Sequence, residues 1–405
     1  NLIPRNSIIF KSVLFLTLLF SNQNEQYVLL ISFDGFRADY IDWYNTPNFD
    51  QLKLDGVKSE GLKPVFPTKT FPNHYSIATG MYIENHGLIG NNFFDQKLGE
   101  FYTLKDRDKV EDERFYGGEP IWATAEKQGV KTASYFWVGS EANAGGAQPS
   151  IWKKYNEKRP FEARVDSVIK WFKMPKPIRP KLVLLYFHEP DKTGHHYGPK
   201  SGKTRNMVEK IDDLLGSIIK KAKSLDIYNQ LNIIILSDHG MTETNKKKMI
   251  PLNKYINKKK IKVEGSGPYA LLYSNDENEL NKAFDNLKEV KHINIYKKNE
   301  IPKDWHFNDH YRIKDLLVLA DEGWTLLEND HNVSAYFSKG NHGYDNKLKS
   351  MNAIFFAKGP YFKKNYNAPI INNIDIYPLI AHILNIIPNN KIDGKLENVI
   401  NILEK

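Results

Sequence analysis

The sequence predicts an α/β fold, a sandwich in which helices cover a central, mostly parallel sheet. Three apolar runs, 27–33, 182–187 and 233–237, lack the alternation of apolar and polar residues that marks a strand with one wet face. They therefore predict strands that are buried on both faces. Segments of helical character, such as 207–225, lie between them, and this alternation is typical of helices packed on a parallel sheet.

Polar side chains follow each of these three runs. Asp34 comes directly after the first, 188–191 follows the second, and Asp238 and His239 follow the third. In open α/β sheets, ligands bind beyond the carboxyl ends of the strands. The sequence therefore places a candidate site at this edge of the sheet.

The remainder of the chain predicts one domain over residues 25–390, followed by a C-terminal segment, 391–405. Residues 241–340 are less regular and rich in lysine and asparagine, so we expect a subdomain inserted within the same unit. A strand near 353–357 and a helix near 376–384 complete the expected fold. With 405 residues, of which 41% are hydrophobic, the chain can bury a core of this size.

The first residues have the pattern of a secretory signal. Arg5 and Lys11 precede an apolar run, 13–20, and polar residues follow at 21–24. Residues 1–24 are therefore predicted to be a signal peptide and the protein to be exported. The alternatives are a retained membrane anchor and a wrongly assigned start, since residue 1 is Asn and not Met. No other stretch of the sequence is long and apolar enough to predict a membrane contact after cleavage.

Composition restricts the chemistry. The chain contains no cysteine, so a metal ion would have to be held by histidine and carboxylate side chains. The formal charge is +9, from 57 basic and 48 acidic residues. The scattered lysines predict a solvated surface or a mildly positive field that attracts anionic substrates. Because the sequence has no motif for reading a nucleic-acid groove, no sequence-specific nucleic acid is expected as a partner.

Several short motifs carry residues that can bind metal ions. An aspartate and a histidine four residues apart can converge on one ion if they share a helical turn, and glycines beside the other candidates allow tight turns. Taken singly, each motif also fits a turn cap, a loop hydrogen bond or an exposed histidine. Together they fit two zinc ions about 4 Å apart, the arrangement used for in-line displacement at phosphorus. The candidate ligands are Asp34, Asp191, His195, Asp238, His239 and His342.

Thr70 is the candidate nucleophile. It precedes a helix that we expect to begin near Pro72. A hydroxyl at a helix N-terminus lies in a positive field, which suits an alkoxide and a phosphate. The alternative is that Thr70 simply caps the helix.

The order of the motifs resembles the nucleotide pyrophosphatase/phosphodiesterase family of the alkaline phosphatase superfamily. The resemblance extends from about Tyr27 to Pro388. It rests on the segments 33–35, 66–74, 119–122, 189–199, 238–241 and 340–344.

The resemblance implies an alkaline-phosphatase-like three-layer sandwich and two zinc ions. One zinc ion would be held by Asp191, His195 and His342. The other would be held by Asp34, Asp238 and His239, with Thr70 bridging to it as the nucleophile.

The resemblance also implies a substrate site and a reaction. Asn91 would donate a hydrogen bond to a phosphate oxygen, Phe71 and Tyr155 would sandwich a nucleobase, and Trp137 would line the nucleotide pocket. Val138 stands where the family commonly has proline. A nucleotide phosphodiester or pyrophosphate would be cleaved through a nucleotidyl-threonine intermediate, with release of a nucleoside 5′-monophosphate. Because family members from eukaryotes carry disulfides and further domains, a bacterial-type, periplasmic or secreted enzyme is expected.

Other functions remain open. A phospholipid or choline-phosphodiester hydrolase of the same family would use the same metals without a base pocket, and the Phe71 and Tyr155 pair favours nucleotides. A phosphomonoesterase is disfavoured because no arginine follows Thr70. A non-catalytic binding protein is disfavoured because the complete ligand set and Thr70 are present. The oligomeric state is not predicted.

Overall fold

An eight-stranded sheet lies at the centre of the computed structural model, which describes residues 25–330 and 337–404. The predicted signal peptide, 1–24, lies outside the described residues. The strand order is β19-β2-β18-β9-β1-β8-β6-β7, and β18 alone runs antiparallel to its neighbours in this sheet. The strands are β1 (Tyr27–Phe33), β2 (Val57–Ser59), β6 (Thr132–Tyr135), β7 (Ile151–Lys153), β8 (Leu182–Phe187), β9 (Leu231–Leu236), β18 (Phe355–Lys358) and β19 (Tyr366–Ala368).

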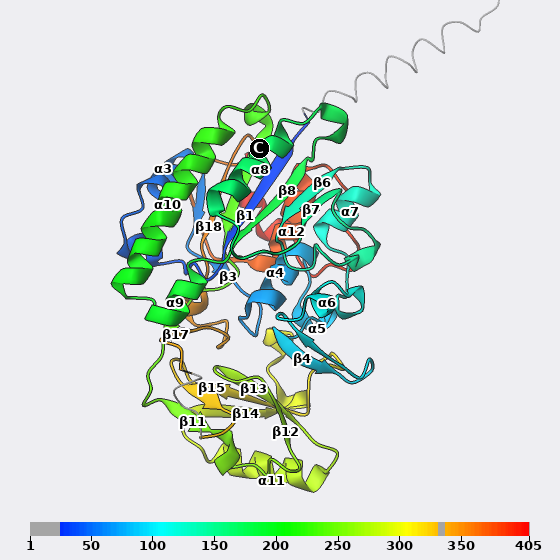
Figure 1. Ribbon diagram of the computed structural model, residues 1–405, viewed down its shortest axis with the longest axis vertical. Helices are drawn as coiled ribbons and strands as arrows, with labels where there is room; N and C mark the ends of the chain where they lie inside the picture. Colours follow the sequence, from blue (N-terminus) through cyan, green and yellow to red (C-terminus); the bar gives the residue numbers. More distant parts are fainter. Residues whose placement is uncertain (1–24, 331–336, 405) are drawn as a thin grey trace, which may run out of the picture.

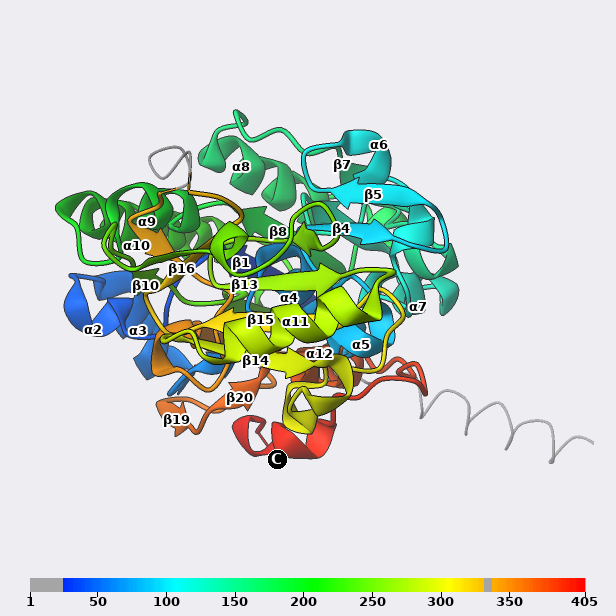
Figure 2. The same ribbon diagram turned by 90° about the horizontal axis from the view of Figure 1, so that it is seen from below.

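Helices cover both faces of this sheet, as the uninterrupted apolar strands predicted. Successive residues of β1 enter different cores, because Val28 and Leu30 pack in one hydrophobic cluster while Leu29 and Ile31 pack in the other. The first cluster contains α4 (Thr70–Thr79), α7 (Ile121–Lys127) and α12 (Ile376–Ile383). The second contains α3 (Pro47–Asp55), α8 (Phe161–Phe172) and α10 (Gly202–Ala222). Figures 1 and 2 show the resulting three layers.

Most of the predicted elements are present with small shifts in their ends. β1 and β8 have the predicted bounds, β9 begins two residues early, and α10 begins five residues before the predicted helix and ends three residues short of it. The start of α4 differs from the prediction, because the helix begins at Thr70 and not near Pro72. Pro72 fits within the first turn, where its missing N–H group would have no helical acceptor.

A separate sheet is formed by part of the predicted insertion. The strands β12 (Lys262–Glu264), β13 (Tyr269–Tyr273), β15 (Leu316–Ala320) and β14 (Ile293–Lys297) pair in that order, all antiparallel. The helix α11 (Glu277–Lys288) packs on this sheet through Ala283 and Leu287. In Figure 1 this unit lies beyond the end of the central sheet where α4 and α9 (Asp191–Tyr197) are found.

The two ends of this inserted segment meet at the candidate site. The short strands β10 (Thr242–Glu243) and β17 (Gly340–Asn341) pair antiparallel, and His342 follows immediately. The inserted segment therefore leaves and rejoins the central unit at one place.

The remaining α-helices and strands are α2 (Tyr40–Trp43), α5 (Ile83–His86), α6 (Arg107–Val110), β3 (Leu62–Lys63), β4 (Asn92–Asp95), β5 (Glu100–Thr103), β11 (Met249–Pro251), β16 (Thr325–Leu327) and β20 (Ile371–Asn372). Within residues 25–330 and 337–404, no helix is long and apolar enough to cross a membrane.

Candidate active site

The candidate site lies at the carboxyl ends of the three central strands. Asp34 directly follows β1, Asp191 begins α9 four residues after β8, and Asp238 lies two residues after β9. The parallel register brings these ends together, and two hydrogen bonds fix them: Asp191 N–H donates to the Asp34 carbonyl at 2.9 Å, and Gly35 N–H to Asp238 Oδ1 at 3.2 Å. The strand ends therefore gather the carboxylates that the sequence placed far apart.

The six predicted metal ligands form two overlapping clusters. In each cluster, one ligand atom per residue lies within 4.8 Å of the others: Asp34, Asp238 and His239 form the first, and Asp191, His239 and His342 the second. His195 joins the second cluster, because its Nε2 lies 3.4 Å from Asp191 Oδ1 and 3.1 Å from His342 Nε2. His239 belongs to both clusters. The structure thus brings together the residues of each predicted ligand set, and it adds His239 to the set of Asp191, His195 and His342.

The three histidines present the same nitrogen to the site. Each Nδ1 lies against a backbone carbonyl: His195 against Gly340 at 2.7 Å, His239 against Gly240 at 2.8 Å, and His342 against Thr68 at 2.7 Å. A carbonyl only accepts, so each Nδ1 carries a proton and each Nε2 faces the cluster. This is the arrangement by which proteins orient histidine for a metal ion.

The electrostatics of the site favour a bound cation. Burial, together with the charges of Asp238 and Asp191, raises the pKa of Asp34 well above its usual range. The buried atoms Asp34 Oδ1 and Asp191 Oδ1 receive no hydrogen bond from the described residues. Burial and the nearby positive groups hold the pKa of His342 well below its usual value, which keeps the imidazole neutral. Buried carboxylate oxygens without hydrogen bonds and histidine Nε2 atoms fit zinc, which binds both ligand types.

Thr70 faces this cluster from the first turn of α4. Its Oγ1 lies 3.2 Å from His239 Nε2. Lys69 occupies the N-cap position, so Thr70 is the first helical residue and not the cap. Asn91 Oδ1 accepts from the Phe71 N–H at 3.0 Å, which leaves the Asn91 amide nitrogen as a donor beside Thr70. The helix N-terminus and this amide together suit an anionic phosphate.

A cavity of about 240 Å³ opens beside Thr70. It is lined by every predicted substrate-binding residue, namely Phe71, Asn91, Trp137 and Tyr155, and by metal-ligand candidates including Asp34, Asp191, His195 and His342. Trp137 is only 1% exposed, and its Nε1 donates to the His74 carbonyl at 3.1 Å. The Trp137 ring therefore acts as a fixed wall of the cavity.

Three further residues of this cavity were missed by the sequence analysis. The Tyr186 hydroxyl donates to Asp34 Oδ2 at 2.6 Å, and Arg107 forms an ion pair with Glu141. Glu141 also accepts from the Tyr155 N–H at 3.1 Å. Burial raises the pKa of Glu141 despite the opposing charge of Arg107. Tyr186 lies on β8, five residues before Asp191, whereas no local sequence pattern links Arg107 and Glu141.

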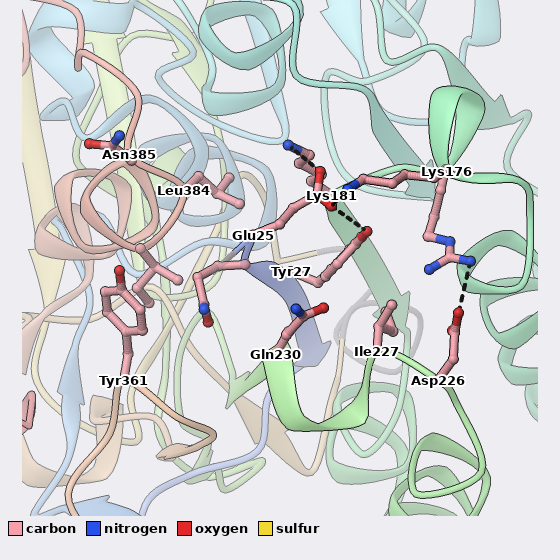
Figure 3. A pocket seen from close by; sticks show the side chains of 13 residues that line it. Glu25, Tyr27, Lys176, Lys181, Asp226, Ile227, Gln230, Tyr361, Leu384 and Asn385 are labelled. Atoms are coloured by element: carbon pink, nitrogen blue, oxygen red, sulfur yellow. Dashed lines mark hydrogen bonds and ion pairs between the residues drawn. The ribbon is translucent and has the colours of Figure 1, made fainter. Parts of the chain in front are cut away.

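A larger cavity, about 590 Å³, lies at the opposite end of β1 (Figure 3). Its charged side chains already pair with one another. Glu25 contacts Lys181 at 2.7 Å and Lys176 at 3.0 Å, and Arg179 contacts Asp226 at 3.2 Å. Because each of these charged side chains has an oppositely charged partner, they are less available to a ligand than the groups beside Thr70.

Comparisons with known proteins agree with this geometry. The family model for type I phosphodiesterase / nucleotide pyrophosphatase matches residues 28–345. Venom phosphodiesterase from Naja atra is 38% identical over 92% of this chain, which spans 46% of that relative. Ectonucleotide pyrophosphatase/phosphodiesterase family member 5 from Homo sapiens is 38% identical over 94% of this chain and 78% of its own length.

Solved structures give the same result. Human ectonucleotide pyrophosphatase/phosphodiesterase 5 superposes with a TM-score of 0.89 and 37% identity, covering 94% of this chain and 100% of the other. The murine protein, solved as an inactive variant with a threonine replaced by alanine and in complex with AMP, matches equally well. These matches confirm the expected alkaline-phosphatase-like fold with its mostly parallel sheet. The chain belongs to the type I phosphodiesterase / nucleotide pyrophosphatase family of the alkaline phosphatase superfamily.

Proposed function

We propose that this protein is a hydrolase that cleaves nucleotide phosphodiester or pyrophosphate bonds and releases a nucleoside 5′-monophosphate. The observation that carries the proposal is the placement of Thr70. Its hydroxyl lies at a helix N-terminus, against two clusters of aspartate and histidine, and at the mouth of a cavity that contains Phe71 and Tyr155. The AMP complex of the murine relative supports a nucleotide as the substrate.

The cofactor in this proposal is a pair of zinc ions. Asp191, His195 and His342, from the second cluster, would hold one ion, and the first cluster, Asp34, Asp238 and His239, would hold the other beside Thr70. Bound there, the ions would supply positive charge to the phosphoryl oxygens and promote ionisation of a hydroxyl.

The reaction uses two displacements at phosphorus. Thr70 Oγ1 forms a bond to phosphorus while the bond to the leaving oxygen breaks, giving a nucleotidyl-threonine. Water then displaces Thr70 and releases the monophosphate. The Asn91 amide donates to a phosphoryl oxygen, where charge develops, and the positive end of α4 favours the same charge. Phe71 and Tyr155 hold the base between them.

The decisive experiment replaces Thr70 by alanine. The rate on the p-nitrophenyl ester of thymidine 5′-monophosphate should fall by about 10³-fold or more, because the covalent nucleophile is lost. Zinc content and unfolding temperature should stay near those of the wild type, since the Thr70 hydroxyl caps no helix. Near-full turnover by Thr70→Ala would contradict the proposal. Faster hydrolysis of glycerophosphocholine than of the nucleotide ester would support the phospholipid alternative, and preference for p-nitrophenyl phosphate would support a phosphomonoesterase.

The domain organisation and the location of the enzyme are also proposals. Residues 25–390 would form the phosphodiesterase catalytic domain, with 241–340 as its inserted subdomain and 391–405 as a C-terminal segment. Export to the periplasm or to the outside of the cell follows from the predicted signal peptide. Relatives named venom phosphodiesterase agree with export. The bacterial origin stays a prediction.

A further inference from the structure

A buried histidine that is absent from both metal clusters lies beneath the site. His74 belongs to α4, one helical turn after Thr70, and its side chain has no exposed surface. A fully buried imidazole is costly unless both of its nitrogens have partners. Those partners indicate what the residue does.

The two nitrogens of His74 contact three segments of the chain. Nδ1 lies 3.0 Å from the Thr70 carbonyl oxygen and 3.3 Å from Asp238 Oδ2. The contact with the Thr70 carbonyl is a hydrogen bond, so Nδ1 carries a proton. The contact with Asp238 Oδ2 is electrostatic, because that buried atom accepts no hydrogen bond from the described residues. Nε2 forms a hydrogen bond of 2.8 Å with the hydroxyl of Ser32.

These contacts join the parts that must stay aligned for the proposed reaction. The Thr70 carbonyl belongs to the nucleophile, Asp238 is a ligand candidate from the end of β9, and Ser32 lies on β1, two residues before Asp34. One ring therefore touches the nucleophilic turn, one predicted metal ligand, and the strand that delivers another.

The surroundings of His74 limit its movement. Trp137 and Tyr186 each form a T-shaped contact with it, with ring centroids 5.3 and 5.1 Å from that of His74. Tyr186 in turn donates to Asp34, and Trp137 donates to the backbone carbonyl of His74. The ring cannot turn away from Asp238 without disturbing two walls of the cavity.

We propose that His74 is a positioning residue. The N–H group at its Nδ1 holds the nucleophilic turn at Thr70 and the carboxylate of Asp238 at a fixed separation. The proposal rests on the proposed function, because it assigns roles to Thr70 and Asp238. The group that matters is the hydrogen-bond donor at Nδ1. The contact of Nε2 with Ser32 orients the ring.

Two amide substitutions separate these contacts. In His74→Asn, the side-chain NH₂ group can occupy the place of Nδ1, donate to the Thr70 carbonyl and keep a positive hydrogen near Asp238 Oδ2. In His74→Gln, the amide reaches the Nε2 side and keeps the contact with Ser32, but offers no donor at the Nδ1 position. Both variants replace a buried ring by an amide, so their packing defects are similar.

The measurements are kcat and KM on the nucleotide ester, zinc affinity by competition with a chelator, and unfolding temperature. Loss of an outer contact to a metal ligand costs about 10- to 100-fold in metal affinity or activity. His74→Gln should therefore lose about that much in kcat and in zinc affinity, with KM changed less. His74→Asn should recover most of both, at a similar unfolding temperature.

His86 provides the matched control. It is also buried, and its Nε2 contacts the Ser76 hydroxyl at 2.8 Å, but it touches neither Thr70 nor Asp238. His86→Gln should lower the unfolding temperature without changing kcat or zinc affinity. Equal losses in His74→Asn and His74→Gln, or a loss that follows the unfolding temperature as in His86→Gln, would overturn the proposal. If the wild type hydrolysed no nucleotide ester, the proposed function would fail, while the zinc affinities would still test the role of His74.

Discussion

Asn91 is tied to the first turn of α4 through Phe71, whose backbone N–H donates to Asn91 Oδ1 at 3.0 Å. The side chain is thereby oriented by its oxygen, and its nitrogen is the atom left to meet a substrate. The same hydrogen bond connects the nucleophilic turn to the loop that precedes β4, so the two phosphate-binding elements of the proposal move together.

Replacement of Asn91 by aspartate should separate these two functions of its amide. Asn91→Asp keeps an oxygen for the Phe71 N–H but replaces the donor by a negative charge. Removing one donor of this kind costs about 10²- to 10³-fold in kcat. Steady-state kinetics should show such a loss, with little change in unfolding temperature. Asn91→Ala should be less stable as well as slow, and wild-type turnover by both variants would remove Asn91 from the reaction.

Tyr155 should discriminate between substrates with and without a base. Its side chain lines the cavity, and the centroid of its ring lies 5.2 Å from that of Phe136. Stacking is worth about 1–3 kcal/mol per base, so Tyr155→Ala should lower kcat/KM for a nucleotide diester by about 10-fold or more. Bis-p-nitrophenyl phosphate should be affected much less, and Tyr155→Phe, which keeps the ring, should behave like the wild type. Equal losses on both substrates would indicate a packing residue and favour a lipid headgroup.

Metal removal should proceed in two stages. Asp34, Asp238 and His239 are buried, whereas the side chains of Asp191 and His195 are 16% and 31% exposed. A chelator should therefore extract the ion of the outer cluster first, and activity should be lost with it and return with added zinc. Metal analysis should find two zinc ions per active chain. Fewer than one tightly bound ion in fully active protein would contradict the two-zinc proposal.

Mild acid should weaken the contact between Gly87 and the inserted segment, because the His310 ring lies against this glycine. Burial and the charge of Arg312 lower the pKa of His310 to about 4, whereas an unfolded histidine titrates near 6.5. Because the folded value is the lower one, the unfolded state takes up the proton first as the pH falls. The stability that depends on neutral His310 is thus complete above about pH 6.5 and is lost as the pH falls toward about 4.

Urea unfolding at several pH values tests this expectation. His310→Gln removes the titrating group, so its stability should fall less steeply than that of the wild type between pH 6.5 and 4. His306→Gln is the comparison variant, because this partly exposed histidine lies on the same segment but stacks on Tyr82 and lies 3.4 Å from Glu84, not against Arg312. Parallel curves for His310→Gln and the wild type would show that His310 contributes nothing to acid sensitivity.

The order of motifs along the chain was enough to predict the fold and the family. Strands such as 182–187 are buried on both faces, and such strands must be apolar throughout, which leaves a local signal. The polar residues that end them, including Asp34 and Asp238, are also visible locally. The sequence therefore predicted the parallel sheet, the edge at which the site lies and the six ligand candidates.

Tertiary structure alone decided how these residues meet and what supports them. The carbonyls of Thr68, Gly240 and Gly340 fix which nitrogen each histidine presents, and Arg107 finds Glu141 across 34 residues of chain. Contacts of this kind leave no pattern in the sequence, because a backbone carbonyl is present at every residue and any charged side chain can pair with another. The role of His74 is of the same origin: its partners, Ser32 and Asp238, converge on the ring only once β1 and β9 lie side by side in the sheet.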